Sequence, residues 1–175
     1  FPYDSLTEEN RRRGSDQLEF ELLDTGIFDD DRYFDVFVEY AKAGVDDILM
    51  LVTAHNRGAE AAPLHLLPQI WFRNTWSWHR DAYKPALAAA GNEVVKIRHR
   101  DWGDYQFYAD GASTLLFCDN ETNGRRLYGM ASAGYFKDAF RGASVRGDSR
   151  AVNPRRAGTK AAAHYRFSVA PGEAV

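Results

Sequence analysis

The sequence is poor in cysteine, with Cys118 as its single example among 175 residues. One cysteine excludes an internal disulfide and any zinc site built from several cysteine ligands. Cys118 follows the apolar residues 115–117, so we expect a small, buried hydrophobic residue rather than a nucleophile. A chain without disulfides suits the cytoplasm, which is the location that we expect.

Long apolar runs are lacking as well. No stretch approaches the roughly 20 apolar residues of a membrane-spanning helix, and no secretory signal peptide opens the chain. We therefore expect no membrane partner. The chain begins with Phe1 rather than methionine, and we interpret this end as processed or as the start of an excised fragment.

Charge of one sign is not in excess, because the formal net charge is −3. A nucleic acid is therefore not an expected partner, since its binding surfaces are strongly basic. Proline is scarce at 6 residues, and 45% of the chain is hydrophobic, which excludes a disordered chain. A chain of this length predicts one domain with a core of its own.

The sequence also lacks a P-loop, a GxGxxG fingerprint and a GxSxG nucleophile elbow. Its histidines form no HExxH motif and no pair at i, i+4 spacing, which a helical metal site would need. These histidines are His55, His65, His79, His99 and His164. We therefore expect no metal site and no cofactor.

Aromatic residues, by contrast, make up 14% of the chain, and many of them alternate with polar residues. Alternation with a period of two is typical of strands. It predicts strands over residues 18–22 and 34–40. Further strands are predicted over residues 94–98, 105–109, 114–118 and 160–169. We expect the strand over residues 34–40 to be half-buried.

Two apolar runs predict further strands. Residues 48–52 are apolar on both faces, which predicts a central strand covered on both sides. Pro68 interrupts the run over residues 64–72, so we expect an edge position, a bulge or a break there. Residues 73–93 predict a long loop, and loops of that length in a compact domain are often functional.

One short helix is predicted over residues 131–141, where aromatic residues recur at i, i+4 spacing before Gly142. Residues 1–17 are polar and charged, and we interpret them as a lead-in segment, either helical or extended. Together these features predict a mainly all-β chain. The expected fold is an antiparallel β-sandwich with one or two short helices, as a single domain over residues 18–175.

A tryptophan cluster is the strongest local signal for function. It holds Trp71, Trp76 and Trp78, with Arg73, Asn74 and His79 among and beside them. Indole faces stack on sugar rings and amide or guanidinium groups bind hydroxyls, but tryptophan also anchors cores and interfaces. Both interpretations stay open, and the interdomain or sugar-facing candidates are Trp71, Arg73, Asn74, Trp76 and Trp78.

Several carboxylates lie close together in the sequence and are candidates for an acid–base pair. They are residues 29–31, Asp101 with Asp104, and Asp119 with Glu121. Glycoside hydrolysis needs two carboxyl groups across a cleft. These positions also have the composition of turns, where aspartate is favoured for its local hydrogen bonds. We therefore assign no catalytic residue.

Ordered stretches along nearly the whole chain are similar to one known family. The stretches are 2–3 with 8–13, 20–26, 32–42, 56–58, 69–78, 120–123, 135–140, 151–154 and 158–165. The chain resembles large bacterial glucosidase-like proteins related to mannosyl-oligosaccharide glucosidase, glycoside hydrolase family 63. None of these stretches is a catalytic motif, so the resemblance concerns membership and not chemistry.

The resemblance implies a longer protein, in which an N-terminal β-sandwich region precedes an (α/α)6 barrel. The barrel of that family carries the general acid and the general base and inverts the anomeric carbon. This chain matches an interior fragment of the sandwich region, so the resemblance implies a non-catalytic domain. Its expected partner is its own barrel, whose substrate entrance it would help to shape, and the isolated fragment is expected to self-associate.

Two alternatives remain open. In the first, the chain is a stand-alone carbohydrate-binding module that holds an oligosaccharide at residues 71–78. In the second, it is a self-contained hydrolase that uses Asp101 and Asp104. The first predicts sugar affinity that depends on Trp76 and Trp78. The second predicts turnover by this chain alone.

Overall fold

A computed structural model describes residues 2–78 and 82–175. The chain divides into two compact units. The first comprises the residues up to Leu64 together with Phe167–Val175, and the second is His65–Arg166. The sequence-based division into a lead-in over residues 1–17 and a domain over residues 18–175 stays a prediction.

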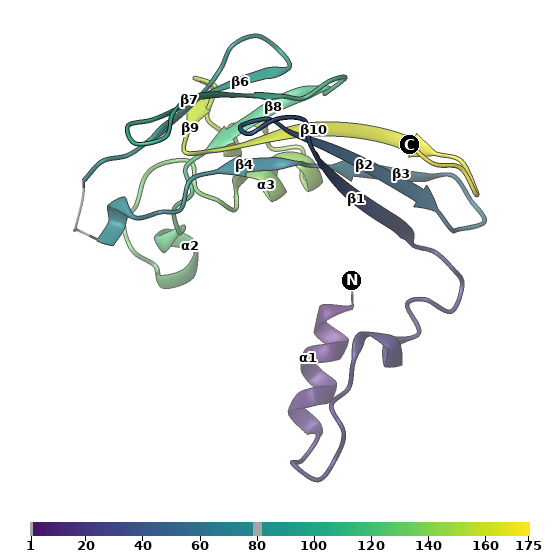
Figure 1. The fold of residues 1–175 in the computed structure, drawn as a ribbon. Helices are drawn as coiled ribbons and strands as arrows, with labels where there is room; N and C mark the ends of the chain where they lie inside the picture. Colours follow the sequence, from purple (N-terminus) through teal and green to yellow (C-terminus); the bar gives the residue numbers. More distant parts are fainter. Residues whose placement is uncertain (1, 79–81) are drawn as a thin grey trace. The chain divides into compact units, whose positions relative to one another are not determined.

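The elements are mainly antiparallel strands, as Figure 1 shows. The described residues include three short α-helices, which are α1 (Tyr3–Arg12), α2 (Gly124–Tyr128) and α3 (Ala139–Val145). The predicted fold class, mainly β with antiparallel pairing, is therefore confirmed. Within these described residues, no helix is long and apolar enough to cross a membrane.

The first unit begins with α1 and a 3-10 turn, η1 (Leu22–Thr25). The strand predicted over residues 18–22 is wrong. The side-chain amide of Asn10 binds both the N–H and the C=O of Phe20 at 2.8 Å, and the carboxylate of Asp24 accepts from the N–H of Glu21 at 2.8 Å. These side chains take the backbone groups that a strand partner would need.

A hairpin of β1 (Phe34–Lys42) and β2 (Ile48–Asn56) follows, with Lys42 opposite Ile48. Its outer part is exposed on both faces: Leu49 is 57% exposed, and Ile48, on the opposite face, is 69% exposed. The expected half-burial of residues 34–40 and double cover of residues 48–52 are therefore wrong. The sequence shows that these residues are apolar, but it does not show whether another layer covers them. In the described residues, β1 and β2 form a two-stranded sheet of their own.

The second unit contains most of the sandwich. One sheet has the order β7 (Gly103–Tyr108), β6 (Val94–His99), β5 (Ala86–Ala89), β9 (Ala157–Gly158). In the other, β10 (Lys160–Val169) pairs with β3 (Ala62–Leu66) and with β4 (Gln69–Trp71), and β8 (Thr114–Cys118) also pairs with β10.

The two sheets share a core. Leu87, Val95 and Ile97 come from β5 and β6, and they cluster with Phe117 and Ala161 from β8 and β10. Leucine, valine and isoleucine at alternate strand positions present one apolar face to the opposite sheet. The predicted antiparallel sandwich is therefore found in this unit.

The second face of β8 and β10 is covered by α3. Leu116 and Ala162 cluster there with Ala139 and Phe140 of the helix. The small alanines at positions 161–163 of β10 are fully buried and let both layers approach the strand closely. This double cover explains why the sequence of β8 and the first half of β10 is apolar without interruption.

Several predicted strands are confirmed in place. They are the strands over 94–98, 105–109, 114–118 and 160–169, which correspond to β6, β7, β8 and β10. The break expected at Pro68 separates β3 from β4. The long loop predicted over residues 73–93 is only partly present, because β5 and a 3-10 turn, η2 (Trp76–Trp78), lie inside it.

The helix predicted over residues 131–141 is displaced toward the C-terminus, to α3. Gly142 lies inside α3 rather than after it. A Cβ atom there would stand 2.9 Å from Ala151 Cβ, so this glycine permits close approach of η3 (Ser149–Ala151). Helix α2 was not predicted, and the side chain of Asn123 caps it by accepting from Arg126 N at 3.1 Å.

Candidate functional site

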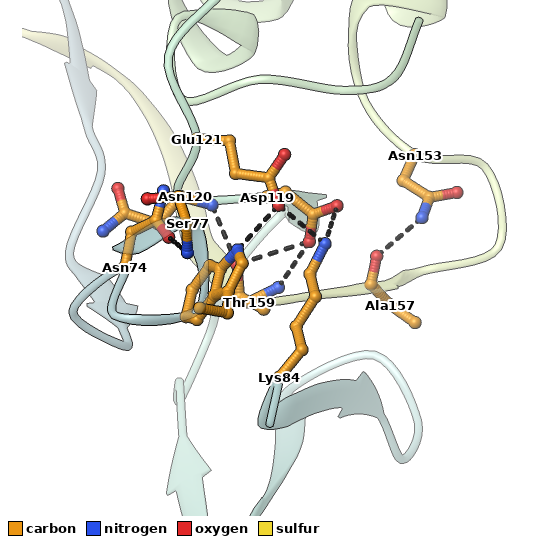
Figure 2. Close-up of polar contacts among 10 residues, drawn as sticks. Asn74, Ser77, Lys84, Asp119, Asn120, Glu121, Asn153, Ala157 and Thr159 are labelled. Atoms are coloured by element: carbon orange, nitrogen blue, oxygen red, sulfur yellow. Dashed lines mark hydrogen bonds and ion pairs between the residues drawn. The ribbon is translucent and has the colours of Figure 1, made fainter. Parts of the chain in front are cut away.

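The candidate site lies in the second unit, where three loops converge. Asp119 and Glu121 follow β8, Thr159 immediately precedes β10, and Trp76 and Lys84 belong to the segment that leads into β5. Figure 2 shows the side chains of Lys84, Asp119 and Glu121 pointing toward one another. We call Trp76, Lys84, Asp119 and Glu121 the Lys84 cluster.

Thr159 fixes the carboxylate end of the cluster. Asp119 Oδ1 accepts from Thr159 N at 3.1 Å and from Thr159 Oγ1 at 3.3 Å. The same hydroxyl accepts from Asn120 N at 2.8 Å, and Thr159 is 1% exposed. Because Asn120 Nδ2 also donates to Phe72 O at 2.9 Å, the loop after β8 is tied to the end of β4. These hydrogen bonds therefore hold in place the loop that carries the two carboxylates.

Lys84 bridges the two carboxylates. Its Nζ lies 2.8 Å from Asp119 Oδ2 and 2.9 Å from Glu121 Oε1. Glu121 Oε1 also accepts from Trp76 Nε1 at 2.8 Å, and the ammonium lies 5.7 Å from the centroid of the Trp76 ring. The three charged side chains are 30–40% exposed. The cluster is thus a half-exposed surface in which one ammonium is shared by two carboxylates, with an indole at its edge.

The pKa of Lys84 is raised above its ordinary value of 10.5. Burial is the largest single influence on this pKa and lowers it. The hydrogen bonds and charges of Asp119 and Glu121 together outweigh that influence. Lys84 is therefore charged at neutral pH and is a structural cation rather than a base.

Each tryptophan of the predicted cluster carries a cation near its ring. Lys160 Nζ lies 5.8 Å from the Trp71 ring centroid, Lys84 Nζ lies 5.7 Å from that of Trp76, and Arg73 Cζ lies 4.9 Å from that of Trp78. Trp71 and Trp78 are 53% and 48% exposed. Cation–π contacts of this kind hold exposed indoles in place.

The sequence-based candidates do not all have the same role. Asn74 Oδ1 accepts from Ser77 N at 3.2 Å and so shapes the turn into η2. His79 lies outside the described residues. The structure joins Trp76 to Glu121, which were singled out for separate reasons. Lys84 and Thr159 were missed, because a lone lysine and a lone threonine carry no motif.

Three of the other carboxylates that were considered have arginine partners near the surface. Asp104 pairs with Arg98 at 3.3 Å, and Asp101 with Arg100 at 3.4 Å. Asp30 pairs with Arg32 at 2.5 Å. These are exposed ion pairs, which contribute little to stability. None of them assembles two carboxylates around a shared space.

Two histidines form a second polar pair. His164 Nε2 and His65 Nδ1 lie 3.2 Å apart, and His164 is 6% exposed. Burial lowers the pKa of His164, and the neighbouring His65 and Arg166 lower it further. No group of three or more potential metal ligands among His, Cys, Asp and Glu occurs in residues 2–78 and 82–175.

An exposed tryptophan outside the predicted cluster completes a short aromatic stack. The rings of His99 and Trp102 lie 4.1 Å apart at 16°, and those of Phe72 and His99 lie 5.5 Å apart at 29°. Trp102 is 66% exposed. Because it lies far along the chain from residues 71–78, sequence spacing did not connect it with them.

Comparison with known proteins gives one curated relative. The uncharacterized protein YMR196W of Saccharomyces cerevisiae is 35% identical to the chain over 213 residues. The similarity covers the whole chain but 20% of the yeast protein, so the chain spans about a fifth of the length of the relative that it matches. No protein-family model matches the chain, and no solved structure matches it significantly.

Proposed function

We propose that this chain is a non-catalytic β-sandwich domain of a larger, glucosidase-like, inverting glycoside hydrolase. In this proposal a separate (α/α)6 barrel carries out the chemistry. The sandwich supports that barrel and contributes to the entrance of its active site. The resemblance of the ordered stretches to glycoside hydrolase family 63 supports the assignment, and so does a relative of which the similarity covers only 20%.

The observation that carries the non-catalytic role is the bridge formed by Lys84. A glycosidase needs one carboxyl group that delivers a proton and a second that acts as a base or nucleophile. Here Asp119 and Glu121 are both hydrogen-bonded to one ammonium group, at 2.8 and 2.9 Å. An ammonium that occupies both carboxylates suits a structural support better than an acid–base pair.

The test compares hydrolysis by the purified 175-residue chain and by the full-length yeast relative. Both proteins are incubated with a panel of α-glucosidic oligosaccharides, and released glucose is measured. We expect turnover by the full-length relative and none by the chain. Turnover by the chain alone would overturn the non-catalytic role, and Asp119→Asn and Glu121→Gln would then locate the acid pair. An inactive full-length relative would overturn the assignment to a hydrolase.

A second candidate function is carbohydrate binding by the chain itself. The exposed rings of Trp71 and Trp78, each beside a cation, favour it, since an indole with a nearby donor suits a sugar ring. Isothermal titration with gluco-oligosaccharides tests this candidate. Trp78→Ala should abolish binding, while Trp102→Ala, an exposed tryptophan outside the segment, should not. No heat of binding in the unmodified chain would remove this candidate.

A further inference from the structure

The hairpin β1–β2 has an edge that is only half paired. Residues 173–175 lie against the last residues of β2: Ala54 N donates to Val175 O at 2.8 Å, Val175 N to Ala54 O at 3.0 Å, and Asn56 N to Glu173 O at 3.0 Å. In the part of the chain that the structure describes, no strand pairs with the same edge from Ile48 to Thr53.

The direction of the unpaired backbone groups follows from these bonds. The polar groups of Ala54 and Asn56 point away from β1. In a strand, every second residue turns its N–H and C=O toward the same edge. The N–H and C=O groups of Ile48, Met50 and Val52 therefore point to the open edge, while those of Leu49 and Leu51 point toward β1.

Burial along β2 follows the same division. Ala54 and Asn56, at the paired end, are 0% and 2% exposed. Ile48 and Met50, at the open end, are 69% and 39% exposed. An edge that is both long and apolar is a template for a further strand, and proteins ordinarily cover, shorten or charge such edges.

The side chains beside the open edge form an apolar face. Residues opposite one another in an antiparallel pair share a face. Val38 lies opposite Val52, and Tyr40 lies opposite Met50. Val38 and Tyr40 are 47% and 70% exposed, so this face extends across both strands of the hairpin.

We propose that the edge of β2 from Ile48 to Thr53 is the docking site of an extended segment that lies outside these 175 residues in the same, longer polypeptide. This segment pairs antiparallel with β2, in line with residues 173–175, and its apolar residues cover Ile48, Met50 and Val52. It adds a third strand to the hairpin by β-augmentation.

Two observations favour this occupant over a second copy of the chain. Residues 173–175 already run antiparallel to β2 along this edge, so a strand in line with them extends an existing pairing. The yeast relative has four-fifths of its length outside the similarity, which provides ample chain for a further strand. The inference does not depend on hydrolase activity, since strand pairing requires none.

Amide hydrogen exchange resolved to single residues tests the proposal. In the 175-residue chain, we expect the amides of Ile48, Met50 and Val52 to exchange quickly and those of Leu49 and Leu51 to be protected. In the full-length yeast relative, measured as a monomer, the positions aligned with Ile48, Met50 and Val52 should exchange about a hundredfold more slowly than in the chain.

A matched pair of substitutions at the position aligned with Met50 separates pairing from side-chain loss. Proline removes the N–H that points to the open edge, while threonine keeps it, and both remove the long apolar side chain. In the full-length relative, proline but not threonine should restore fast exchange at the flanking aligned positions. If the apolar face rather than the backbone edge holds the segment, the proline and threonine variants should show equal exchange at these positions.

Three outcomes would overturn the proposal. One is fast exchange at the aligned edge positions in the full-length relative. A second is protection that appears only as the concentration of the 175-residue chain rises, which would assign the edge to a second copy. A third is equal exchange in the proline and threonine variants. None of these results depends on the hydrolysis assay, so the two proposals can fail separately.

Discussion

Gly158 lies directly against the backbone of Cys118. The N–H of the next residue, Thr159, donates to Cys118 O at 3.1 Å, and a Cβ atom at Gly158 would overlap that carbonyl group. The neighbouring atoms are backbone and cannot turn aside. This contact brings β9 against β8, and it lies directly beside the carboxylate end of the Lys84 cluster.

Gly158→Ala should therefore destabilise the fold by about 3 kcal/mol or more, because a buried clash with backbone forces strands apart. Urea unfolding measures the loss. Gly44→Ala is the matched control: a Cβ atom there meets only Asp47 Cβ, at 3.8 Å. It should change stability by less than about 0.5 kcal/mol. Equal effects in the two variants would contradict the close approach at Gly158.

Lys84→Met should destabilise the chain by about 0.5–1 kcal/mol, since the ion pairs are partly exposed but the substitution leaves two carboxylates side by side. Lys96→Met, at an exposed position of β6, is the control and should be nearly neutral. Urea unfolding of both variants at neutral pH measures the difference. A neutral Lys84→Met would show that the bridge does not stabilise the loop after β8.

The raised pKa of Lys84 also predicts a pH dependence. In the unfolded chain Lys84 loses its proton near its ordinary pKa of 10.5, and in the folded chain it loses it at higher pH. The stabilisation by charged Lys84 is therefore fully present below pH 10.5, and it is lost as the pH rises through the pKa of Lys84 in the folded chain. Unfolding curves on both sides of 10.5 should show a loss in the unmodified chain that is smaller in Lys84→Met.

Much of the sandwich was predictable because its pattern is local. The strands β8 and β10 were placed from their sequence alone, since an apolar run bounded by polar turns is distinctive. The exposure of β2 was not predictable, because Leu49 and Leu51 are apolar whether or not a layer covers them. The region of residues 18–22 failed for a different reason, since the amide of Asn10 binds Phe20 from outside the local pattern.

The candidate site was predictable in part. The tryptophans were visible as a cluster, and Asp119 and Glu121 were visible as a close pair. Their meeting was not, because the contact from Trp76 to Glu121 spans 45 residues of sequence. Lys84 completes the cluster from the segment that also holds Trp76, and Thr159 supports Asp119 from the start of β10. Only the packed sandwich brings such distant loops together.

Cys118 should be unreactive in the native chain. It is 1% exposed, and burial raises its pKa to about 12. The thiolate that reacts with disulfide reagents is therefore scarce and inaccessible at neutral pH. In native buffer, Ellman's reagent should react slowly and label less than one thiol per chain. In concentrated guanidinium chloride, it should label one thiol per chain rapidly. Rapid labelling under native conditions would contradict the burial of β8 beneath α3.

His164 should make the chain less stable under mildly acidic conditions. Its pKa in the folded chain is lowered, first by burial and then by His65 and Arg166, while in the unfolded chain it is near 6.5. The unfolded state therefore binds the proton more readily. The contribution of neutral His164 to the stability is fully present above pH 6.5 and is lost as the pH falls below that value. In His164→Gln this position cannot titrate, and the slope of unfolding free energy against pH just below 6.5 should become smaller. Chemical unfolding of both proteins across that range provides the measurement, and an unchanged slope would assign the acid sensitivity to other groups.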